Sequence, residues 1–128
     1  KGAAADADLA DGLRVTGDPD LLYRAVYNIL ANAQQAMQGP GGISVRGDVD
    51  LAGHTVLRFR DTGPGFSEDA LQKALDPFFT TKDTGTGLGL PIVRSIIESH
   101  GGRLSLANAQ NGGAVITIDF MPQTENNS

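Results

Sequence analysis

The sequence predicts an α+β fold, a two-layer α/β sandwich in which helices cover one face of a mixed, mostly antiparallel sheet. Three observations support this prediction. One long segment has the apolar period of a helix, two pairs of segments alternate as strands do, and two further helix signals lie between those pairs. With 128 residues, the chain is long enough for one domain with its own core.

The two ends of the chain have a different composition from its middle. Residues 1–12, KGAAADADLADG, are small, polar and acidic, and we expect a flexible lead or the remnant of a first strand there. Residues 123–128 are polar and predict a disordered tail. The folded domain is therefore expected to span residues 13–122.

A long amphipathic helix is predicted from residue 18 to residue 38. Asp18 is a suitable N-cap, and Pro19 is well tolerated in a first turn. The apolar residues that recur at helical spacing are Leu22, Val26, Ile29, Ala33 and Met37. Gly39 marks the end of this helix.

Two strand pairs are predicted, one on each side of a central segment. Residues 43–49 (ISVRGDV) and 55–61 (TVLRFRD) alternate apolar and polar side chains around the turn DLAG. Residues 103–108 (RLSLAN) and 114–120 (AVITIDF) do the same around AQNGG. Each pair is expected to be antiparallel.

Two further helices are predicted between the strand pairs. Ser67 can cap a short helix with the sequence EDALQKAL, which Pro77 stops. A second helix is expected from about Leu90 to His100, where HGG ends it. Pro91 is compatible with this helix because it falls in the first turn.

Composition excludes several kinds of site. The chain has no cysteine and only two histidines, so disulfides, thiolate metal sites and a multi-histidine metal centre are not expected. The net charge is −5 and the ten Lys and Arg residues are scattered singly along the sequence, which disfavours nucleic acid as a partner. No apolar run approaches a membrane span, so we expect no direct membrane contact by this domain and a cytoplasmic location.

Polar residues at three places predict a ligand site. Asn28 and Asn32 are four residues apart and share one flank of the long helix, where an amide oxygen suits magnesium that already receives phosphate charge. Asp61 ends a strand and precedes Gly63 and Gly65, so its carboxylate can accept a hydrogen bond from an amine such as that of adenine. Taken alone, the asparagines also fit the polar edge of a buried face, and DTGPG also fits an ordinary tight turn.

A second glycine cluster, GTGLGLPIV at residues 85–93, opens the later helix. Its backbone N–H groups and the helix N-terminus can hold phosphate oxygens, and Lys82 adds a positive charge at the other end of the loop. Neither a Walker A loop nor the dinucleotide fingerprint matches these residues. Without its neighbours, the cluster is also compatible with a generic glycine loop.

Taken in order, these segments resemble the sensor histidine kinase ATP-binding domain. GDPDLLYRAVYNILANAQQAM, DTGPGF, DPFFTTK and GTGLGLPIV resemble its N box, first glycine box, F box and second glycine box. The resemblance runs from about Gly17 to Pro122. The sequences NAQQAM and FFTTK resemble those of the nitrogen-regulation and dicarboxylate-sensing branch. It implies the Bergerat fold of the GHKL ATPases, with ATP held between the helix layer and a mobile lid.

The resemblance also implies a role for individual residues. Asn32 would coordinate Mg²⁺, Asn28 would support the phosphates and Asp61 would accept the adenine amino group, while Asn28 and Lys82 would be the catalytic pair. The nucleotide-binding residues implied are Asn28, Asn32, Gln35, Asp61, Gly63, Gly65, Phe79, Thr80, Thr81, Lys82, Gly85, Thr86, Gly87, Leu88, Gly89 and Leu90. Two positions depart from the pattern, because many relatives have a cation at Gln35 and a threonine at Ala114.

The expected function follows from the resemblance and from one substitution. Related ATPases that use water have a glutamate general base at the position of Asn28, and an amide cannot take a proton at neutral pH. We therefore expect a protein-histidine kinase domain that passes the γ-phosphate of Mg-ATP to a histidine on a separate helical dimerisation domain, with a response regulator downstream. The parent kinase is either membrane-anchored or free.

Two other expectations concern alternatives. A nucleotide-gated binding module, or an anti-sigma-type serine kinase of the same superfamily, fits the same motifs. Neither histidine is expected to accept phosphate: His100 is interpreted as a helix-terminal residue whose partial positive charge interacts with the helix dipole, and His54 as a solvated residue in a hairpin turn.

Overall fold

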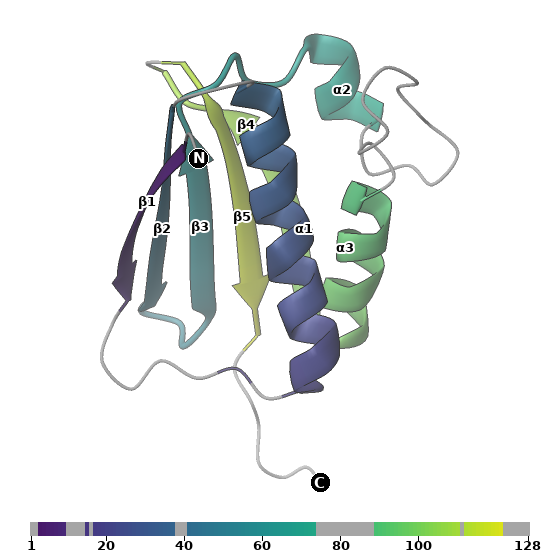
Figure 1. Ribbon diagram of the computed structural model, residues 1–128. Coiled ribbons are helices and arrows are strands. Elements are labelled where there is room, and N and C mark those ends of the chain that lie inside the picture. The colour runs from purple at the N-terminus through teal and green to yellow at the C-terminus, as the bar shows by residue number, and fades with distance from the viewer. Residues whose placement is uncertain are drawn as a thin grey trace, which may run out of the picture.

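The computed structural model describes residues 3–9, 15, 17–37, 41–73, 89–110 and 112–121 (Figure 1). The side chains of residues 3–9, 35, 36, 73 and 89 lie outside this description. The helices are α1 (Pro19–Met37), α2 (Glu68–Lys73) and α3 (Gly89–Ser99). The strands are β1 (Ala3–Leu9), β2 (Gly41–Val49), β3 (Thr55–Asp61), β4 (Gly102–Asn108) and β5 (Ala114–Phe120).

The five strands form one sheet in the order β1-β2-β3-β5-β4. β1 pairs with β2 in parallel, and the other three pairings are antiparallel. All three helices lie on one side of the sheet (Figure 1). The predicted two-layer fold with a mixed, mostly antiparallel sheet is therefore confirmed, and the described part of the lead, Ala3–Leu9, is a strand.

Helix α1 begins where its capping residue predicts. The Asp18 carboxylate accepts hydrogen bonds from the backbone N–H groups of Asp20 at 2.9 Å and Leu21 at 3.3 Å. These bonds satisfy two of the donors that a helix N-terminus leaves without intrahelical partners. α2 begins in the same way, since the Ser67 hydroxyl accepts from the Ala70 N–H at 3.0 Å.

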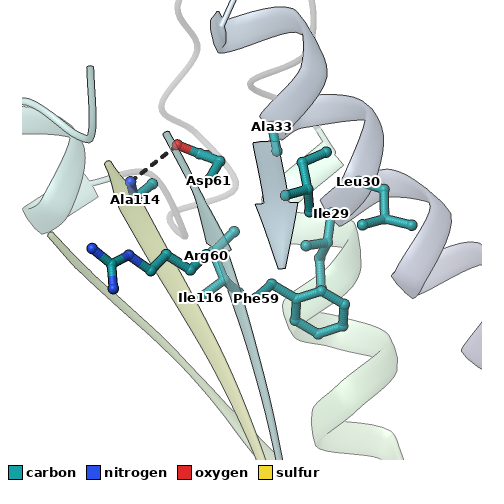
Figure 2. Close-up of a pocket in the computed structure, with 9 residues that line it drawn as sticks. Ile29, Leu30, Ala33, Phe59, Arg60, Asp61, Ala114 and Ile116 are labelled. Carbon is teal, nitrogen blue, oxygen red and sulfur yellow. Dashed lines mark hydrogen bonds between the residues drawn. The ribbon is translucent and has the colours of Figure 1, made fainter. Parts of the chain in front are cut away.

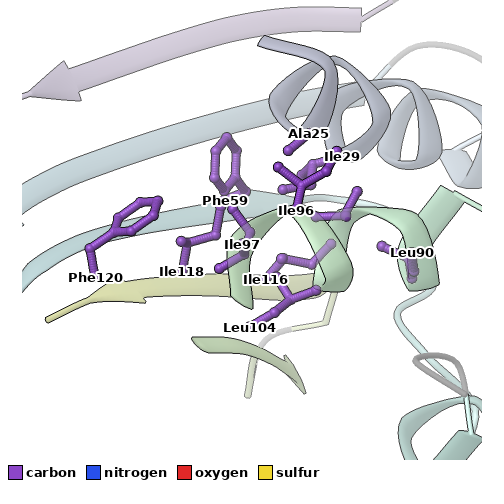
Figure 3. Close-up of a cluster of buried hydrophobic side chains, with 11 residues drawn as sticks. Ala25, Ile29, Phe59, Leu90, Ile96, Ile97, Leu104, Ile116, Ile118 and Phe120 are labelled. Carbon is purple, nitrogen blue, oxygen red and sulfur yellow. The ribbon is translucent and has the colours of Figure 1, made fainter. Parts of the chain in front are cut away.

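The core lies between the helices and the helix-facing side of the sheet (Figure 3). Alternation along β5 buries every second residue, and all four apolar residues on its inner face are buried. The core residues are Ala25, Ile29, Phe59, Leu90, Val93, Ile96, Ile97, Leu104, Ile116, Ile118 and Phe120. Because α1 and α3 both pack on this cluster, they are held side by side over the sheet.

His100 joins the end of α3 to the beginning of α1. Its Nε2 accepts a hydrogen bond from the backbone N–H of Asp18 at 3.0 Å, and its Nδ1 lies 2.8 Å from the carbonyl oxygen of Ile96. A nitrogen that accepts cannot carry a proton, so Nδ1 is the donor and the ring is neutral in this geometry. The predicted helix-terminal position is confirmed, but the interaction with the helix dipole through a positive charge is not what the structure has.

The prediction that His54 is merely solvated is wrong. Its Nδ1 lies 2.6 Å from the carboxylate of Asp119, a residue of β5 that is 65 positions away. The side chain is only 25% exposed. The hairpin turn after β2 is thereby attached to the neighbouring strand, a contact that no local pattern indicates.

Among the described residues, no helix combines the length and the apolar character that crossing a membrane needs.

Candidate functional site

Asp61 is the one buried charged or polar side chain among the described residues, with 6% of its surface exposed. It ends β3, where the strand leaves the sheet. Its Oδ1 accepts hydrogen bonds from the backbone N–H of Gly63 at 2.8 Å and from that of Ala114 at 3.1 Å (Figure 2). Two backbone donors therefore fix the orientation of this carboxylate, which buried charges require.

Both of these hydrogen bonds use the same oxygen. Within the described residues, Oδ2 of Asp61 has no hydrogen-bond partner. An ionised carboxylate oxygen is a pure acceptor, so Oδ2 can receive a hydrogen bond from a donor on a ligand. The structure thus presents one acceptor at the end of the central strand β3, already oriented before any ligand arrives.

The surroundings of Asp61 on the helix side are apolar. A small cavity of about 10 Å³ lies between α1 and the sheet beside this carboxylate, which is room for about one water molecule. Its lining residues are Ile29, Leu30, Ala33, Ile43, Phe59, Arg60, Asp61, Ala114 and Ile116. Figure 2 shows the Arg60 guanidinium pointing away from the helices, so the side of Asp61 that faces α1 is surrounded by apolar side chains.

Glycines allow the backbone to pass close to Asp61. A side chain at Gly63 would stand 3.1 Å from Met37 and 3.2 Å from Oδ1 of Asp61. Gly65 has a φ of 84°, and a Cβ there would lie 2.7 Å from Asn108. These glycines fit the predicted role of admitting a ligand near the carboxylate, and they are also required by the turn itself.

Two residues of this turn region were missed by the sequence interpretation. Gly113 has a φ of 95°, and a Cβ there would lie 2.0 Å from the carbonyl oxygen of Asp61. Asn108 accepts from the Phe66 N–H at 2.7 Å and donates to the Phe66 carbonyl at 2.9 Å. The glycine pair in the turn AQNGG was the available signal for Gly113, whereas nothing local indicates the contact of Asn108.

Asn28 and Asn32 occupy the same helix as the residues that line the cavity beside Asp61. Both side chains are half-buried. The Nδ2 atom of Asn32 is buried and has no hydrogen-bond partner, and it is the one such side-chain atom found among the described residues. A buried amide group without a partner is costly, so this side chain is a candidate for contact with a ligand.

The remaining predicted site residues divide into two groups. Gly89 is the first residue of α3, and Leu90 follows it with a buried side chain, so their backbone N–H groups belong to the first helical turn. The side chain of Gln35 lies outside the described residues, as do Phe79, Thr80, Thr81, Lys82, Gly85, Thr86, Gly87 and Leu88. The described structure thus groups Asp61, Gly63 and Gly65 at the end of β3, and it places Asn28 and Asn32 on α1, whose residues Ile29, Leu30 and Ala33 line the cavity beside Asp61. The loop residues stay a prediction.

No protein-only metal site is present in the described part of the chain, where no group of three or more His, Cys, Asp or Glu residues could hold a metal ion. An ion bound here would need ligands from the nucleotide as well as from an amide such as that of Asn32.

Comparison with known proteins identifies a family. Residues 17–125 match the family of histidine kinase-, DNA gyrase B- and HSP90-like ATPases. The sensor histidine kinase ZraS of Salmonella typhimurium is 39% identical over 82% of this chain, and the C4-dicarboxylate transport sensor protein DctB of Pseudomonas aeruginosa is 46% identical over 79% of it. This chain covers 23% of the ZraS sequence and 17% of the DctB sequence.

Solved structures give the same result. The catalytic domain of histidine kinase ThkA superposes with a TM-score of 0.82 at 30% identity, covering 93% of this chain and 78% of that one. The mycobacterial sensor histidine kinase MprB superposes with a TM-score of 0.81 at 31% identity, covering 94% and 84%. The arrangement at Asp61, the family match and these relatives lead to one conclusion: the chain belongs to the histidine kinase-, DNA gyrase B- and HSP90-like ATPases, and it is an ATP-binding catalytic domain of the sensor histidine kinase type.

Proposed function

We propose that this chain binds Mg-ATP at the Asp61 end of the domain and donates the γ-phosphate to a histidine on a separate helical dimerisation domain of the parent kinase. The observation that carries the proposal is the Asp61 carboxylate, fixed by the N–H groups of Gly63 and Ala114 with its second oxygen left to accept. Adenine offers an exocyclic amine at the ring position where guanine has a carbonyl oxygen. The apolar surroundings of the carboxylate support the same assignment, because a purine amine that reaches Asp61 meets few competing polar groups there.

The metal assignment rests on Asn32. Its amide has one atom without a partner, and an amide can turn to present either its oxygen or its nitrogen. We therefore assign the amide oxygen of Asn32 as the protein ligand of Mg²⁺, which would supply positive charge to the phosphates. Asn28, one turn earlier on the same flank, would orient the phosphate groups.

The phosphates are proposed to lie toward the N-terminus of α3. The first-turn N–H groups of Gly89 and Leu90 have no partners within their helix, and we propose that they bind phosphate oxygens together with the backbone of Gly85, Thr86, Gly87 and Leu88. Gln35, Phe79, Thr80 and Thr81 would complete the walls of the site. Lys82 would stabilise the charge of the γ-phosphate as it moves.

Transfer to a second group is proposed in preference to hydrolysis. Neither Asn28 nor Asn32 can act as a general base, because an amide does not accept a proton near neutral pH. His100 is unsuitable as the acceptor, since both of its ring nitrogens are engaged with Asp18 and Ile96. The partners we propose are the dimerisation domain, which carries the histidine, and a response regulator downstream, both in the cytoplasm where ATP is supplied.

The decisive experiment separates binding from transfer. The chain is incubated with γ-labelled ATP and Mg²⁺, alone and with the helical dimerisation domain of its parent kinase. We expect binding but negligible labelling in the first case, and acid-labile label on the added domain in the second. Lys82→Ala should reduce transfer more than ATP affinity, because positioning and charge at the γ-phosphate are the main catalytic contributions.

Four results would contradict the proposal. Acid-labile label on His100 in the isolated chain would place the acceptor within this domain, and His100→Gln serves as the control for that outcome. Rapid phosphate release from the isolated chain would show a water-using ATPase. Acid-stable label on a serine of a partner would favour the anti-sigma-type kinase, whereas ATP binding without any transfer would favour a nucleotide-gated module.

A further inference from the structure

The face of the sheet opposite the three described helices carries a group of arginines. Arg46 on β2 and Arg58 and Arg60 on β3 are all exposed, and all three positions alternate with residues of the buried face. They are three of the ten Lys and Arg residues in a chain of net charge −5. Figure 2 shows the Arg60 side chain extending to the side of β5 that lies away from α1. We refer to Arg46, Arg58 and Arg60 as the arginine patch.

The three arginines are mutual neighbours in the sheet. Arg46 and Arg58 are register partners in the antiparallel pair, so their Cβ atoms stand roughly 5 Å apart. Arg60 is two residues from Arg58 on the same strand and diagonal to Arg46. Like charges placed directly opposite one another destabilise a sheet, so this arrangement is unfavourable for the isolated domain.

Within the described residues, none of the three guanidinium groups makes a hydrogen bond or an ion pair. Arg94 on α3 contrasts with them, because its guanidinium is bonded to the carboxylate of Glu98 at 2.9 Å. In the register of the sheet, Asp8 of β1 is the neighbour of Arg46, while the neighbours of Arg58 are Arg46 and Thr117. Arg58 and Arg60 therefore have no acidic residue directly opposite them. Asp48 and Asp119 stand diagonal to Arg58, and the carboxylate of Asp119 is bonded to His54.

The surface around the patch favours a short protein segment over a nucleic acid or a membrane. Beside Arg60 and Arg58 on β5 lie Val115 and Thr117, both half-buried, which offer apolar and hydroxyl contacts. The same face also carries the exposed carboxylate of Asp48, and the whole chain is negatively charged. A nucleic acid or an anionic membrane binds through many phosphates over a wide surface and would lie against this negative charge, whereas a short acidic segment placed on Arg58 and Arg60 covers less of it.

We propose that the arginine patch binds an extended acidic segment of a partner protein, with carboxylates on alternate residues facing Arg58 and Arg60. Side chains two residues apart in a strand lie on one face about 6.6 Å apart, so an extended segment repeats at the same spacing as the two arginines. Each guanidinium can then hold a carboxylate through two parallel hydrogen bonds. The partner would replace the repulsion within the patch by charge-assisted contacts on the side of the sheet opposite to the nucleotide.

The test uses a fluorescent peptide of alternating threonine and glutamate, with a threonine and glutamine peptide as the uncharged control. Anisotropy should report binding of the glutamate peptide to the 128-residue chain, weakened by added salt. The double variant Arg58→Gln/Arg60→Gln should bind it about tenfold or more weakly, because two charge-assisted pairs are lost. Arg94→Gln, on the helix layer, is the matched control and should bind as the unaltered chain does. NMR amide shifts should place the contact on β3 and β5.

Folding of the double variant is checked separately. We expect its thermal midpoint to stay the same or rise, because like charges on neighbouring strands have been removed. A well-folded double variant that binds the glutamate peptide as tightly as the unaltered chain would overturn the proposal. So would equal binding of the glutamine peptide, or the absence of any binding. Tighter binding of a DNA duplex or of phosphatidylserine vesicles would replace the acidic protein segment by one of those partners.

Discussion

The polar groups at the two ends of the helix layer differ in how fully they are hydrogen-bonded. At the end where α1 begins, the Asp18 carboxylate caps two backbone N–H groups, and both ring nitrogens of His100 are engaged. At the other end, Asp61 has an oxygen without a partner and Asn32 has a buried nitrogen without one, among the described residues. The first end is complete in itself, and the second has hydrogen-bonding capacity left for a ligand. Stability and binding are therefore expected to respond to different substitutions.

Gly113→Ala should have the largest effect, and it should lower both the stability of the domain and its ATP affinity. The added Cβ would lie 2.0 Å from the Asp61 carbonyl oxygen at a φ of 95°, so β5 or the turn must move. We expect a loss of about 3 kcal/mol in the free energy of unfolding, measured by urea titration, together with weaker ATP binding. Gly112→Ala is the matched control: its φ is 100°, but nothing lies within 4 Å of a Cβ there, so it should lose only about 1 kcal/mol. Equal losses would show that the contact with Asp61 is unimportant.

Asp61→Asn should affect binding and leave folding almost unchanged. The amide oxygen would keep the position of Oδ1, where it accepts from Gly63 and Ala114, so the amide nitrogen must face the ligand. A donor would then meet the adenine amine, and ATP affinity should fall about 10- to 100-fold in calorimetry. The same donor suits the guanine carbonyl, so the ratio of GTP to ATP affinity should rise. An unchanged nucleotide preference would remove Asp61 from the proposed adenine contact.

Asn32→Ala should lower Mg-ATP affinity without lowering stability. The Nδ2 atom is buried and unpaired, so its removal should leave the free energy of unfolding the same or raise it by up to about 1 kcal/mol. Loss of the proposed metal ligand should weaken Mg-ATP binding about tenfold and reduce the dependence of binding on Mg²⁺. Gln34→Ala, an exposed change on the same helix, is the control for helix effects. A clear loss of stability in Asn32→Ala would mean that the amide has a structural partner.

His100→Ala should have the smallest effect and should be confined to stability. It removes the acceptor for the Asp18 N–H and the bond to Ile96, which together contribute about 1 kcal/mol at a partly exposed site. ATP affinity should stay within about twofold of the unaltered value, because the site lies at the opposite end of α1. A large change in ATP affinity would show that the two ends are coupled through the helix layer.

Local signals account for the elements that were predicted from the sequence. Asp18 and Pro19 fixed the start of α1, Ser67 that of α2, and alternation along residues 55–61 placed Asp61 at a strand end. These local signals do not predict the strand order, because the order depends on which segments pair across the sheet. The same limit explains why the partner of His54 and the bond from Asp18 to His100 were missed: they join residues 65 and 82 positions apart.

For some site residues the sequence predicted the position but not the hydrogen-bond partners, and for others it predicted a role that the described structure does not test. The position of Asp61 followed from its strand. However, one of the two N–H groups that hold its carboxylate belongs to Ala114, which lies 53 residues further along the chain. The half-burial of Asn28 and Asn32 agrees with their place beside the apolar stripe of α1. The roles of Lys82, Gly85 and Gly87 rest on the sequence alone, since these residues lie outside the described structure.

The strand order has a consequence for how the chain is made. β5 lies between β3 and β4, yet it comes after both of them in the sequence, and it contributes Ile116, Ile118 and Phe120 to the core. The hairpin of β2 and β3 can form early because its strands are adjacent in the chain. The edge of β3 that faces away from β2 has no neighbouring strand until β5 has been synthesised. We expect a nascent chain that stops before β5 to expose both the edge of β3 and the apolar sides of α1 and α3. Such a chain would be a substrate for chaperones or proteases until β5 emerged from the ribosome.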